Sequence, residues 1–450
     1  MYKIMSQITR LVGINQAVGF SLLARSWQIA AGPVTLLLVA SYFNVAEQGF
    51  FYTFSSVLAL QVLFELGLAF VINQFSSHEF TRLSWGKSGD ILGAKHSKDR
   101  MHAIIKYAVR WYLVVALLIL LFVLPFGLFF FGKHEIVNLQ VSWQLPWILL
   151  VVAAAMYLPI IPILAAIEGS GQVAQINQLR LAQGFFASIL TWAAIYGGLG
   201  LFAAAVTFIV NVIISLTWMI SNYRILLTEA LLTKHIDNKP AFSWGIEVWP
   251  MQWRIAVSWI SGYFIFQLFT PILFYFHGPA IAGRMGMSLV VANVIAIIPL
   301  IWLQANSPAM VKLVSSKNWL ALDALYAKVF WQSTLVSLTG VISISVLLYV
   351  FSAHPLIHRL LPLMDMIYLL IALFLSHVIG ALAHYLRMHK REPFMVLSVI
   401  GAVLTALSMW FFGRLYASTG MVISLMLINL VYGLPSALWL WQRSRKLWHH

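Results

Sequence analysis

In this chain of 450 residues, 61% of the side chains are hydrophobic and 9% are charged, which leaves too few polar groups to cover a water-soluble surface. The composition excludes a soluble enzyme or binding domain and predicts a polytopic membrane protein with room for about a dozen helices of ~20 residues. The formal charge of +15 is attributed to membrane orientation and anionic lipid rather than to nucleic acid. The absence of cysteine excludes disulfides and cysteine-ligated metals.

The apolar segments of the sequence follow one another with short polar connections. Residues 1–20 are mildly amphipathic and are expected on the inner membrane surface, without a clear signal-cleavage site. Residues 44–49 are predicted to form a short turn. The sequence predicts twelve spans, at residues 24–43, 50–73, 109–131, 145–167, 178–197, 200–222, 252–276, 285–309, 327–351, 364–386, 394–412 and 420–442.

Basic residues are distributed unevenly between the two predicted sides of the membrane. Four of the 28 lie on the outer side, and this asymmetry predicts an even number of spans with both termini inside. The architecture expected is therefore an all-α polytopic protein with two pseudo-repeated six-helix lobes. The expected domains are residues 1–223 as the first lobe, 224–251 as a cytoplasmic connection and 252–450 as the second lobe with a basic cytoplasmic tail.

The seventh span, at the start of the second lobe, is polar on two opposite faces. Such a helix must be surrounded by protein or must face a watery cavity, and the stripes as a whole favour a cavity. Pro271 removes a backbone hydrogen bond and predicts a kink. Arg254, Ser258 and Ser261 form the lower polar face, and Tyr263, Gln267 and Thr270 form the upper one.

Charged side chains within or near spans are the first candidates for function. Glu65 is the deepest acid and would titrate, bind a cation or form a structural ion pair. Arg25 and Arg254 lie near inner span ends, where an arginine either snorkels to the interface or binds phosphate oxygens through its planar fork. Asn211 in span six would line a sugar passage or pack against another helix. Glu168 ends span four and is expected at the interface.

A basic stripe precedes the third span. Its members recur at helical spacing on one face, which either docks to anionic headgroups or is a solvated surface. The stripe consists of Lys95, Lys98, His102 and Lys106.

Several segments resemble the Wzx-type O-antigen and polysaccharide flippases of the multidrug/oligosaccharidyl-lipid/polysaccharide exporter superfamily. They lie at equivalent places in the two predicted lobes, which is more specific than hydropathy alone. The matching segments are W-R-I-A-V-S-W-I-S-G-Y-F at 253–264, Q-L-F-T-P-I-L-F at 267–274, A-G-R-M-G-M-S at 282–288, S-W-Q-I-A-A-G-P-V-T-L-L-L-V-A at 26–40, A-E-Q-G-F-F-Y-T-F-S-S-V-L-A-L-Q at 46–61 and F-E-L-G-L-A-F at 64–70.

The resemblance implies a non-enzymatic flippase in the bacterial inner membrane. It would move a polyprenyl-diphosphate-linked oligosaccharide outward by alternating access, together with polysaccharide assembly proteins as partners. Arg25, Arg254 and the basic stripe would receive the diphosphate, and Ser258, Ser261, Gln267 and Asn211 would line the passage. No cofactor is expected; a proton or sodium gradient acting through Glu65 is the expected drive.

Two alternatives remain open on the sequence. A multidrug-type cation antiporter of the same fold would carry several deep acids, whereas Glu65 alone fits here. A membrane glycan polymerase would need a long outer catalytic loop, and the predicted outer loops are short.

Overall fold

The computed structural model describes residues 16–133, 141–232, 243–389 and 393–449. Most of the predicted amphipathic N-terminal segment and the middle of the predicted inter-lobe connection therefore lie outside the described residues. Contacts divide the chain into two compact units. The first unit comprises Met1–Tyr42 and Val57–Trp259, and the second comprises Phe43–Ser56 and Ile260–His450.

The helices confirm the all-α polytopic architecture. Within the described residues, eight helical stretches are long and apolar enough to span a membrane, and each of two bent helix pairs counts as one further span. Helix α10 (Val173–Tyr196) coincides with the predicted span at 178–197, and a backbone break divides the last stretch between the two spans predicted there. Every predicted span overlaps one or more of these helices.

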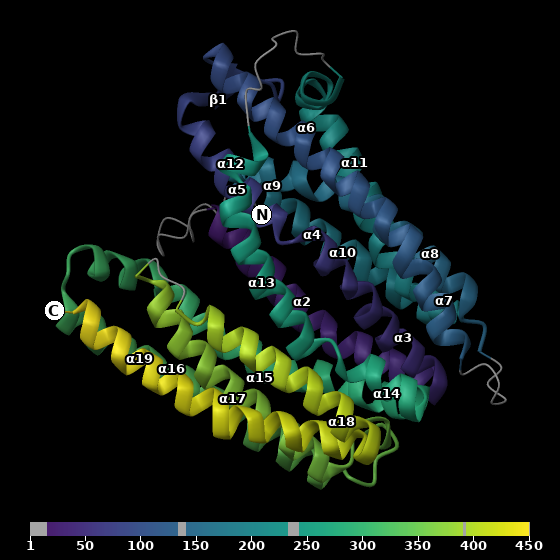
Figure 1. Cartoon of the computed structure of the whole chain (residues 1–450). Coiled ribbons are helices and arrows are strands. Elements are labelled where there is room, and N and C mark those ends of the chain that lie inside the picture. The colour runs from purple at the N-terminus through teal and green to yellow at the C-terminus, as the bar shows by residue number, and fades with distance from the viewer. Residues whose placement is uncertain (1–15, 134–140, 233–242, 390–392, 450) are drawn as a thin grey trace, which may run out of the picture. The chain divides into compact units, whose positions relative to one another are not determined.

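The first unit is a helical bundle with one short hairpin (Figure 1). Helix α10 packs against both α2 and α11, and α5 packs against α9. Strands β1 and β2 pair antiparallel within the polar segment before the third span. The remaining bounds are α2 Gln16–Tyr42, η1 Ala59–Gln61, α4 Val62–Glu65, α5 Leu68–Glu79, η2 Phe80–Arg82, β1 Leu83–Trp85, β2 Ile91–Gly93, α6 Lys95–Leu118, η3 Ile119–Val123, α7 Leu124–Gly132, α8 Gln144–Tyr157, η4 Leu158–Ile160, α9 Ile161–Gly169, η5 Gly200–Phe202, α11 Ala203–Leu227, η6 Thr228–Leu232 and α12 Trp244–Glu247.

From residue 279 on, the second unit is built mainly of long helices that pack side by side, coloured green to yellow in Figure 1. Helix α15 contacts α14, α16 and α17, and α17 contacts α18 and α19. A buried cluster that includes Leu303, Tyr326 and Tyr385 joins α15, α16 and α17. The bounds are α14 Phe269–His277, α15 Pro279–Ser315, α16 Trp319–Val350, η7 Ile357–Arg359, α17 Leu363–Arg387, α18 Met395–Leu427, η8 Ile428–Gly433 and α19 Leu434–Trp448.

Two helices, α3 (Val45–Leu58) and α13 (Trp249–Phe266), are each shared between the units. Residues 45–56 of α3 belong to the second unit, and residues 249–259 of α13 belong to the first unit. The predicted lobe boundaries, at residues 223 and 252, stay a prediction.

The predicted turn at residues 44–49 is instead the start of α3. Asn44 and Glu47 form a reciprocal cap, in which the Glu47 N–H donates to the Asn44 side chain and the Asn44 N–H donates to the Glu47 carboxylate, both at 2.8 Å. Such a cap satisfies two of the N–H groups that a helix start leaves unpaired. The polar residues of this segment therefore mark a helix start, and the non-helical connection is limited to Phe43 and Asn44.

The predicted kink in the seventh span is present. Helices α13 and α14 are separated at Gln267 and Leu268 and meet at a bend of 43°. A proline at 271 cannot donate to the carbonyl four residues earlier, which is that of Gln267, and its ring crowds the same carbonyl. The break therefore lies one turn before the proline.

A second break divides α18, where Tyr416 and Ala417 leave helical geometry and Ala417 has a φ of 49°. Beyond it, Ser418 and Thr419 donate to the same Asp365 carboxylate oxygen, at 2.7 and 2.9 Å. The two hydroxyl donors satisfy the carboxyl group of Asp365, which is buried at the start of α17. Asp365 therefore stabilises the break in α18 by accepting hydrogen bonds from the two residues that follow it.

Candidate functional site

Glu65 lies at a break in the second span, which the sequence analysis treated as continuous. Helix α4 ends at Glu65, and α5 begins at Leu68 after a bend of 47°. Leu66 and Gly67 both take left-handed backbone conformations, with φ of 52° and 66°. A leucine in this region is strained, so surrounding structure must hold the break in place. A Cβ on Gly67 would lie 2.5 Å from the Ile255 side chain of α13.

The Glu65 side chain is only 8% exposed. The Tyr112 hydroxyl of α6, which is fully buried, donates to its carboxylate at 3.4 Å. The same tyrosine lies within hydrogen-bonding reach of the Ala69 backbone at the start of α5. Glu65 and Tyr112 thus connect α4, α5 and α6 at the break.

A cavity of about 420 Å³ lies in the first unit, beyond the break. It is bounded by α5, α8, α9, α10 and the first-unit part of α13. Two of these helices, α5 and α9, lie in close contact. A Cβ on Gly169 would lie 2.1 Å from the Asn73 carbonyl oxygen, so the glycine allows this contact. Its polar lining comprises Asn73, Tyr157, Glu168, Arg180 and Gln183, with Trp259 and several aliphatic side chains completing the wall.

Arg180 and Glu168 form a two-pronged ion pair in this cavity, with N–O distances of 2.9 and 2.6 Å. The arginine side chain is 50% exposed, and the glutamate is 19% exposed. A guanidinium carries five N–H donors, so the pair leaves donors directed away from Glu168. Arg180 is therefore held in one orientation while still able to contact an anion.

Gln183 provides a neutral polar group deeper in the same cavity. Its amide donates to the Ser215 hydroxyl of α11 at 2.7 Å and to the Tyr157 hydroxyl at 3.4 Å. These contacts fix an amide, a phenol and a guanidinium within one cavity. Such groups, together with the ring of Trp259, are suited to hydrogen-bonding and stacking against sugar hydroxyls and ring faces.

The structure places the seven predicted site residues in different surroundings. Five of them lie in the first unit: Arg25 is exposed on α2, Glu65 is buried, Asn211 and Ser258 are half-buried, and Arg254 is exposed. Ser261, which is buried, and Gln267, in the break after α13, belong to the second unit. The lining of the 420 Å³ cavity does not include these seven, although Trp259 directly follows Ser258. Their roles stay predictions.

Arg254 lies beside Trp253, with its guanidinium carbon 5.6 Å from the centre of the indole ring. This cation–π arrangement is common for an arginine at a membrane interface. It is compatible with either of the two roles predicted for Arg254.

The upper polar face of the seventh span packs against α3. The Thr270 hydroxyl donates to the Ser56 hydroxyl at 2.8 Å, and the Tyr263 hydroxyl donates to the Ser56 carbonyl at 3.4 Å. For these two side chains, helix packing replaces the cavity that the stripe favoured. Their polar spacing is explained by one shared partner on a distant segment.

Parts of two segments that carry the family resemblance, those at 46–61 and 282–288, pack together in the second unit. A Cβ on Gly49 would lie 2.0 Å from the Pro279 carbonyl oxygen, and one on Gly283 would lie 2.8 Å from the Gly49 nitrogen. Gln48 is fully buried and donates to the Gly283 carbonyl at 2.9 Å. These motif residues allow α3 and α15 to approach closely, so their direct role is structural.

The basic stripe at the start of α6 is neither a uniform docking face nor a uniformly solvated one. Lys98 pairs with Glu229 of η6 at 2.9 Å, and His102 is 3% exposed and lies 3.7 Å from the same carboxylate. Lys95 is exposed and Lys106 is half-buried. The face therefore binds η6 to α6 within the first unit.

A neighbouring ion pair attaches the inter-lobe connection to the same helix. Arg100 contacts Glu79 at 3.0 Å and Glu247 of α12 at 2.7 Å. Burial by itself would raise the pKa of Glu247, but hydrogen bonds from the Ser243 N–H and from Arg100 outweigh it and lower the pKa. The charged form of Glu247 is thus the one that the folded state favours.

Comparison with known proteins identifies the fold. No protein-family model and no curated protein matches the chain. Among solved structures, an inward-facing multidrug-resistance MATE-family transporter of the MOP superfamily aligns over 92% of this chain and 98% of its own, with 11% identity and a TM-score of 0.61. The lipid II flippase MurJ aligns over 94% of this chain and 87% of its own, with 11% identity and a TM-score of 0.56.

A MOP-superfamily transporter from Pyrococcus furiosus aligns over 97% of this chain and 96% of its own, with 14% identity and a TM-score of 0.55. The chain has the MOP-superfamily fold. Together with the apolar helices, the MOP fold makes this a multi-pass membrane protein. At such low identity the likeness is one of fold, and the cargo must be argued from the site.

Sequence reasoning missed most of the cavity. Arg180 carried a usable signal, because it lies within the predicted fifth span, where a charge is a functional candidate. Gln183, Tyr157 and Asn73 carried none, because single polar residues on apolar helices are common. Gly67, which follows Glu65 closely in an apolar segment, was the available signal for the break.

Proposed function

We propose that this protein is a flippase that moves a polyprenyl-diphosphate-linked oligosaccharide, such as an O-antigen or other surface polysaccharide unit, across the bacterial inner membrane by alternating access. The observation that carries the proposal is the first-unit cavity, where the guanidinium of Arg180 lies beside neutral hydrogen-bonding groups and an indole. Because Arg180 matches the charge of Glu168, the lining carries no net negative charge for a cationic drug, and the guanidinium donors that the pair leaves over suit a sugar diphosphate. The likeness of fold to a lipid II flippase supports the same class of cargo.

In this proposal Arg180 contacts the diphosphate on the inner side. Because Arg180 is already bonded to Glu168, an incoming diphosphate competes with one carboxylate for the same guanidinium. The competition keeps binding reversible, which a transporter needs for release on the other side. Arg25 and Arg254 remain the predicted receiving groups at the mouth, and Ser258, Ser261, Gln267 and Asn211 remain the predicted passage lining.

Glu65 is proposed as the coupling group for a proton or sodium gradient. Its burial, its hydrogen bond from Tyr112 and its position at a helix break support this role. Gaining or losing a proton would alter the bond to Tyr112 and the stability of the break between α4 and α5. No cofactor enters this mechanism.

A multidrug-type cation antiporter is the second candidate, and one observation favours it. Glu65 is a buried acid in a fold shared with MATE transporters, and an acid is the group that a cation gradient or cationic substrate would use. The two candidates differ in the sign of the cargo, so they make opposite predictions for Arg180.

The test is the topology of lipid-linked glycans in cells depleted of this protein. Polyprenyl-diphosphate glycans are extracted, and complete repeat units facing the cytoplasm are measured. We expect accumulation that is rescued by the wild type but not by Arg180→Gln, Arg25→Ala or Arg254→Ala. The matched control is Arg224→Gln, which removes the same charge from an exposed position on α11 outside the cavity.

Each outcome assigns the function differently. If the glycans accumulate and every arginine variant rescues, flipping stands and the proposed site is wrong. If nothing accumulates and the depleted cells become sensitive to cationic dyes, the antiporter replaces the flippase.

A further inference from the structure

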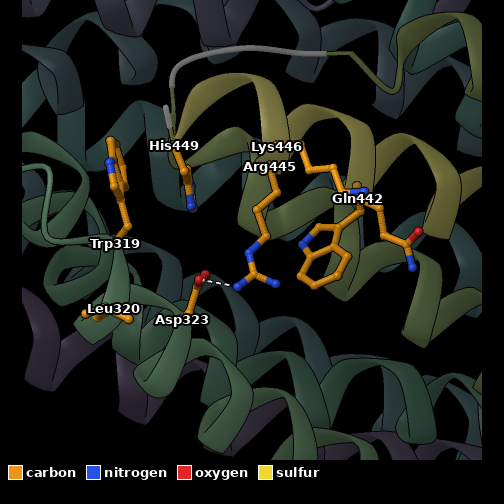
Figure 2. Close-up of a pocket in the computed structure, with 8 residues that line it drawn as sticks. Trp319, Leu320, Asp323, Gln442, Arg445, Lys446 and His449 are labelled. Atoms are coloured by element: carbon orange, nitrogen blue, oxygen red, sulfur yellow. Dashed lines mark hydrogen bonds and ion pairs between the residues drawn. The ribbon is translucent and has the colours of Figure 1, made fainter.

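A separate cavity of about 370 Å³ lies in the second unit, where α16 begins and α19 ends (Figure 2). Its walls combine two indoles, those of Trp319 and Trp441, with the cationic side chains of Arg445 and Lys446. The charge asymmetry of the sequence predicts that this end of the second unit lies at the inner membrane surface. The proposed function makes no use of this cavity.

The walls of this cavity are held by specific contacts. Asp323 accepts a hydrogen bond from the Tyr385 hydroxyl at 2.6 Å and pairs with Arg445, as the dashed line in Figure 2 shows. The guanidinium of Arg445 also lies 5.3 Å from the centre of the Trp441 ring. On the opposite side, the rings of Trp319 and His449 stack at 4.3 Å and 8°. These contacts fix the cavity as a built feature of the bundle.

The charge of the lining favours an anion. Asp323 is the acidic residue that lines the cavity, and its charge is matched by Arg445. Lys446 then contributes a net positive charge, and the guanidinium of Arg445 has N–H donors beyond the one that contacts Asp323. A phosphate group in the cavity would accept hydrogen bonds from the remaining donors of Arg445, and the flexible side chain of Lys446, which extends toward Gln442 in Figure 2, would turn to contact it.

The rim of the cavity favours an amphiphile over a small soluble anion. Leu320 lines the cavity and is 87% exposed, and Leu447 on α19 is 66% exposed. Exposed leucines beside tryptophans and basic residues are typical of the level where lipid headgroups meet acyl chains. Cationic pockets between helices on the inner side are suited to anionic headgroups.

We propose that this cavity binds the phosphate headgroup of an anionic phospholipid of the inner leaflet. Lys446 and Arg445 contact the phosphate, Trp319 and Trp441 border the glycerol region, and Leu320 contacts an acyl chain. The lipid would bridge the start of α16 and the end of α19. The lipid site does not depend on the flippase proposal, and a measurement of lipid binding tests it directly.

The test is native mass spectrometry of the purified, delipidated full-length chain titrated with dioleoyl phosphatidylglycerol or dioleoyl phosphatidylcholine. The anionic lipid is expected to bind more tightly. Lys446→Gln should weaken that binding by about tenfold, the loss expected when one charge-assisted hydrogen bond to phosphate is removed. Lys446 is chosen because removing Arg445 would also leave Asp323 without its ion-pair partner.

The control is Arg443→Gln, which removes the same charge from the same helix, where the arginine lies over Trp439 outside the cavity lining. It should leave the affinity unchanged. An equal loss for Arg443→Gln would show diffuse attraction to a basic surface and overturn the site. Equal affinities for the two lipids would overturn it as well.

A third variant protects the test against misfolding. Lys446→Arg keeps the positive charge at the exposed position, so binding of phosphatidylglycerol should be preserved, and a loss would contradict the assignment. Competition with glycerol 3-phosphate separates the two sources of phosphate. Displacement of the lipid by this soluble headgroup at equal concentration would assign the cavity to a free phosphate and overturn the lipid.

Discussion

Substituting Gly49 by alanine should destabilise the second unit by a large amount for one added methyl group. The new Cβ would lie 2.0 Å from the Pro279 carbonyl oxygen and 2.5 Å from its carbon. Both are backbone atoms at the start of α15, so no side-chain rotation relieves the clash. Ordinary contact distances are about 3.5 Å, so α3 must move away from α15 by roughly 1 Å or more.

The magnitude follows from two opposing effects. Overpacking a well-packed contact costs about 1–3 kcal/mol, and a backbone clash belongs at the upper end of that range. Replacing a helical glycine by alanine raises the free energy of unfolding by roughly 1 kcal/mol through helix propensity, which offsets part of this cost. The net loss is about 2 kcal/mol, which corresponds to a Tm lowered by roughly 4–8 °C for a unit of this size.

The assay is thermal unfolding in detergent, followed by tryptophan fluorescence, with Gly380→Ala as the matched control. Gly380 lies in α17 of the same unit, and a Cβ there meets no atom within 4 Å. The control should melt at or slightly above the wild-type temperature. If Gly49→Ala melts no lower than Gly380→Ala, then the close approach of α3 and α15 is not what this motif glycine provides, and the structural reading of the motif is refuted.

Three further outcomes are expected. Asn44→Ala should lower the free energy of unfolding by about 1 kcal/mol through loss of the helix cap, which the same melting assay measures. Asn44→Asp should keep most of the wild-type stability, because aspartate also caps helices. Gly67→Ala should lower the Tm and impair transport together, because Gly67 has a φ of 66° and its Cβ would strike Ile255; unchanged melting would contradict the strained break. The pKa of Glu247 is lowered on folding, so its ion pair with Arg100 stabilises the protein above the unfolded-state pKa of about 4.3 and is lost as the pH falls through the folded-state value. The melting difference between wild type and Glu247→Gln should therefore correspond to no more than about 1 kcal/mol at neutral pH and vanish in acid; a difference independent of pH would assign it to packing instead.

Much of the fold was accessible from the sequence because its determinants are local. The apolar segments coincide with helices, since each helix satisfies its own backbone hydrogen bonds and needs only enough apolar length to remain in lipid. Pro271 likewise predicted a kink, because its missing N–H acts on a carbonyl one turn away. The turn predicted at residues 44–49 was wrong, because a polar N-capping segment and a turn use the same residue types.

The candidate site was only partly accessible. Glu65 stood out because a carboxyl group deep in an apolar segment is costly anywhere in a membrane protein. Arg180 of α10 forms an ion pair with Glu168 of α9, and Gln183 of α10 donates a hydrogen bond to Ser215 of α11. The polar lining of the cavity therefore depends on contacts between different helices, which the sequence of each helix does not specify.

The sequence by itself predicted which segments are apolar enough to cross the membrane, and it identified the charged side chains that lie within those segments as candidates for function. The tertiary structure alone decided that Thr270 and Tyr263 share Ser56 as a partner, that Gly49 lies against Pro279, and that Arg180 lines a cavity. The physical reason is that a polar side chain at helical spacing has the same pattern whether its hydrogen-bond partner is another helix, water or a ligand. Only the packing of distant segments selects that partner.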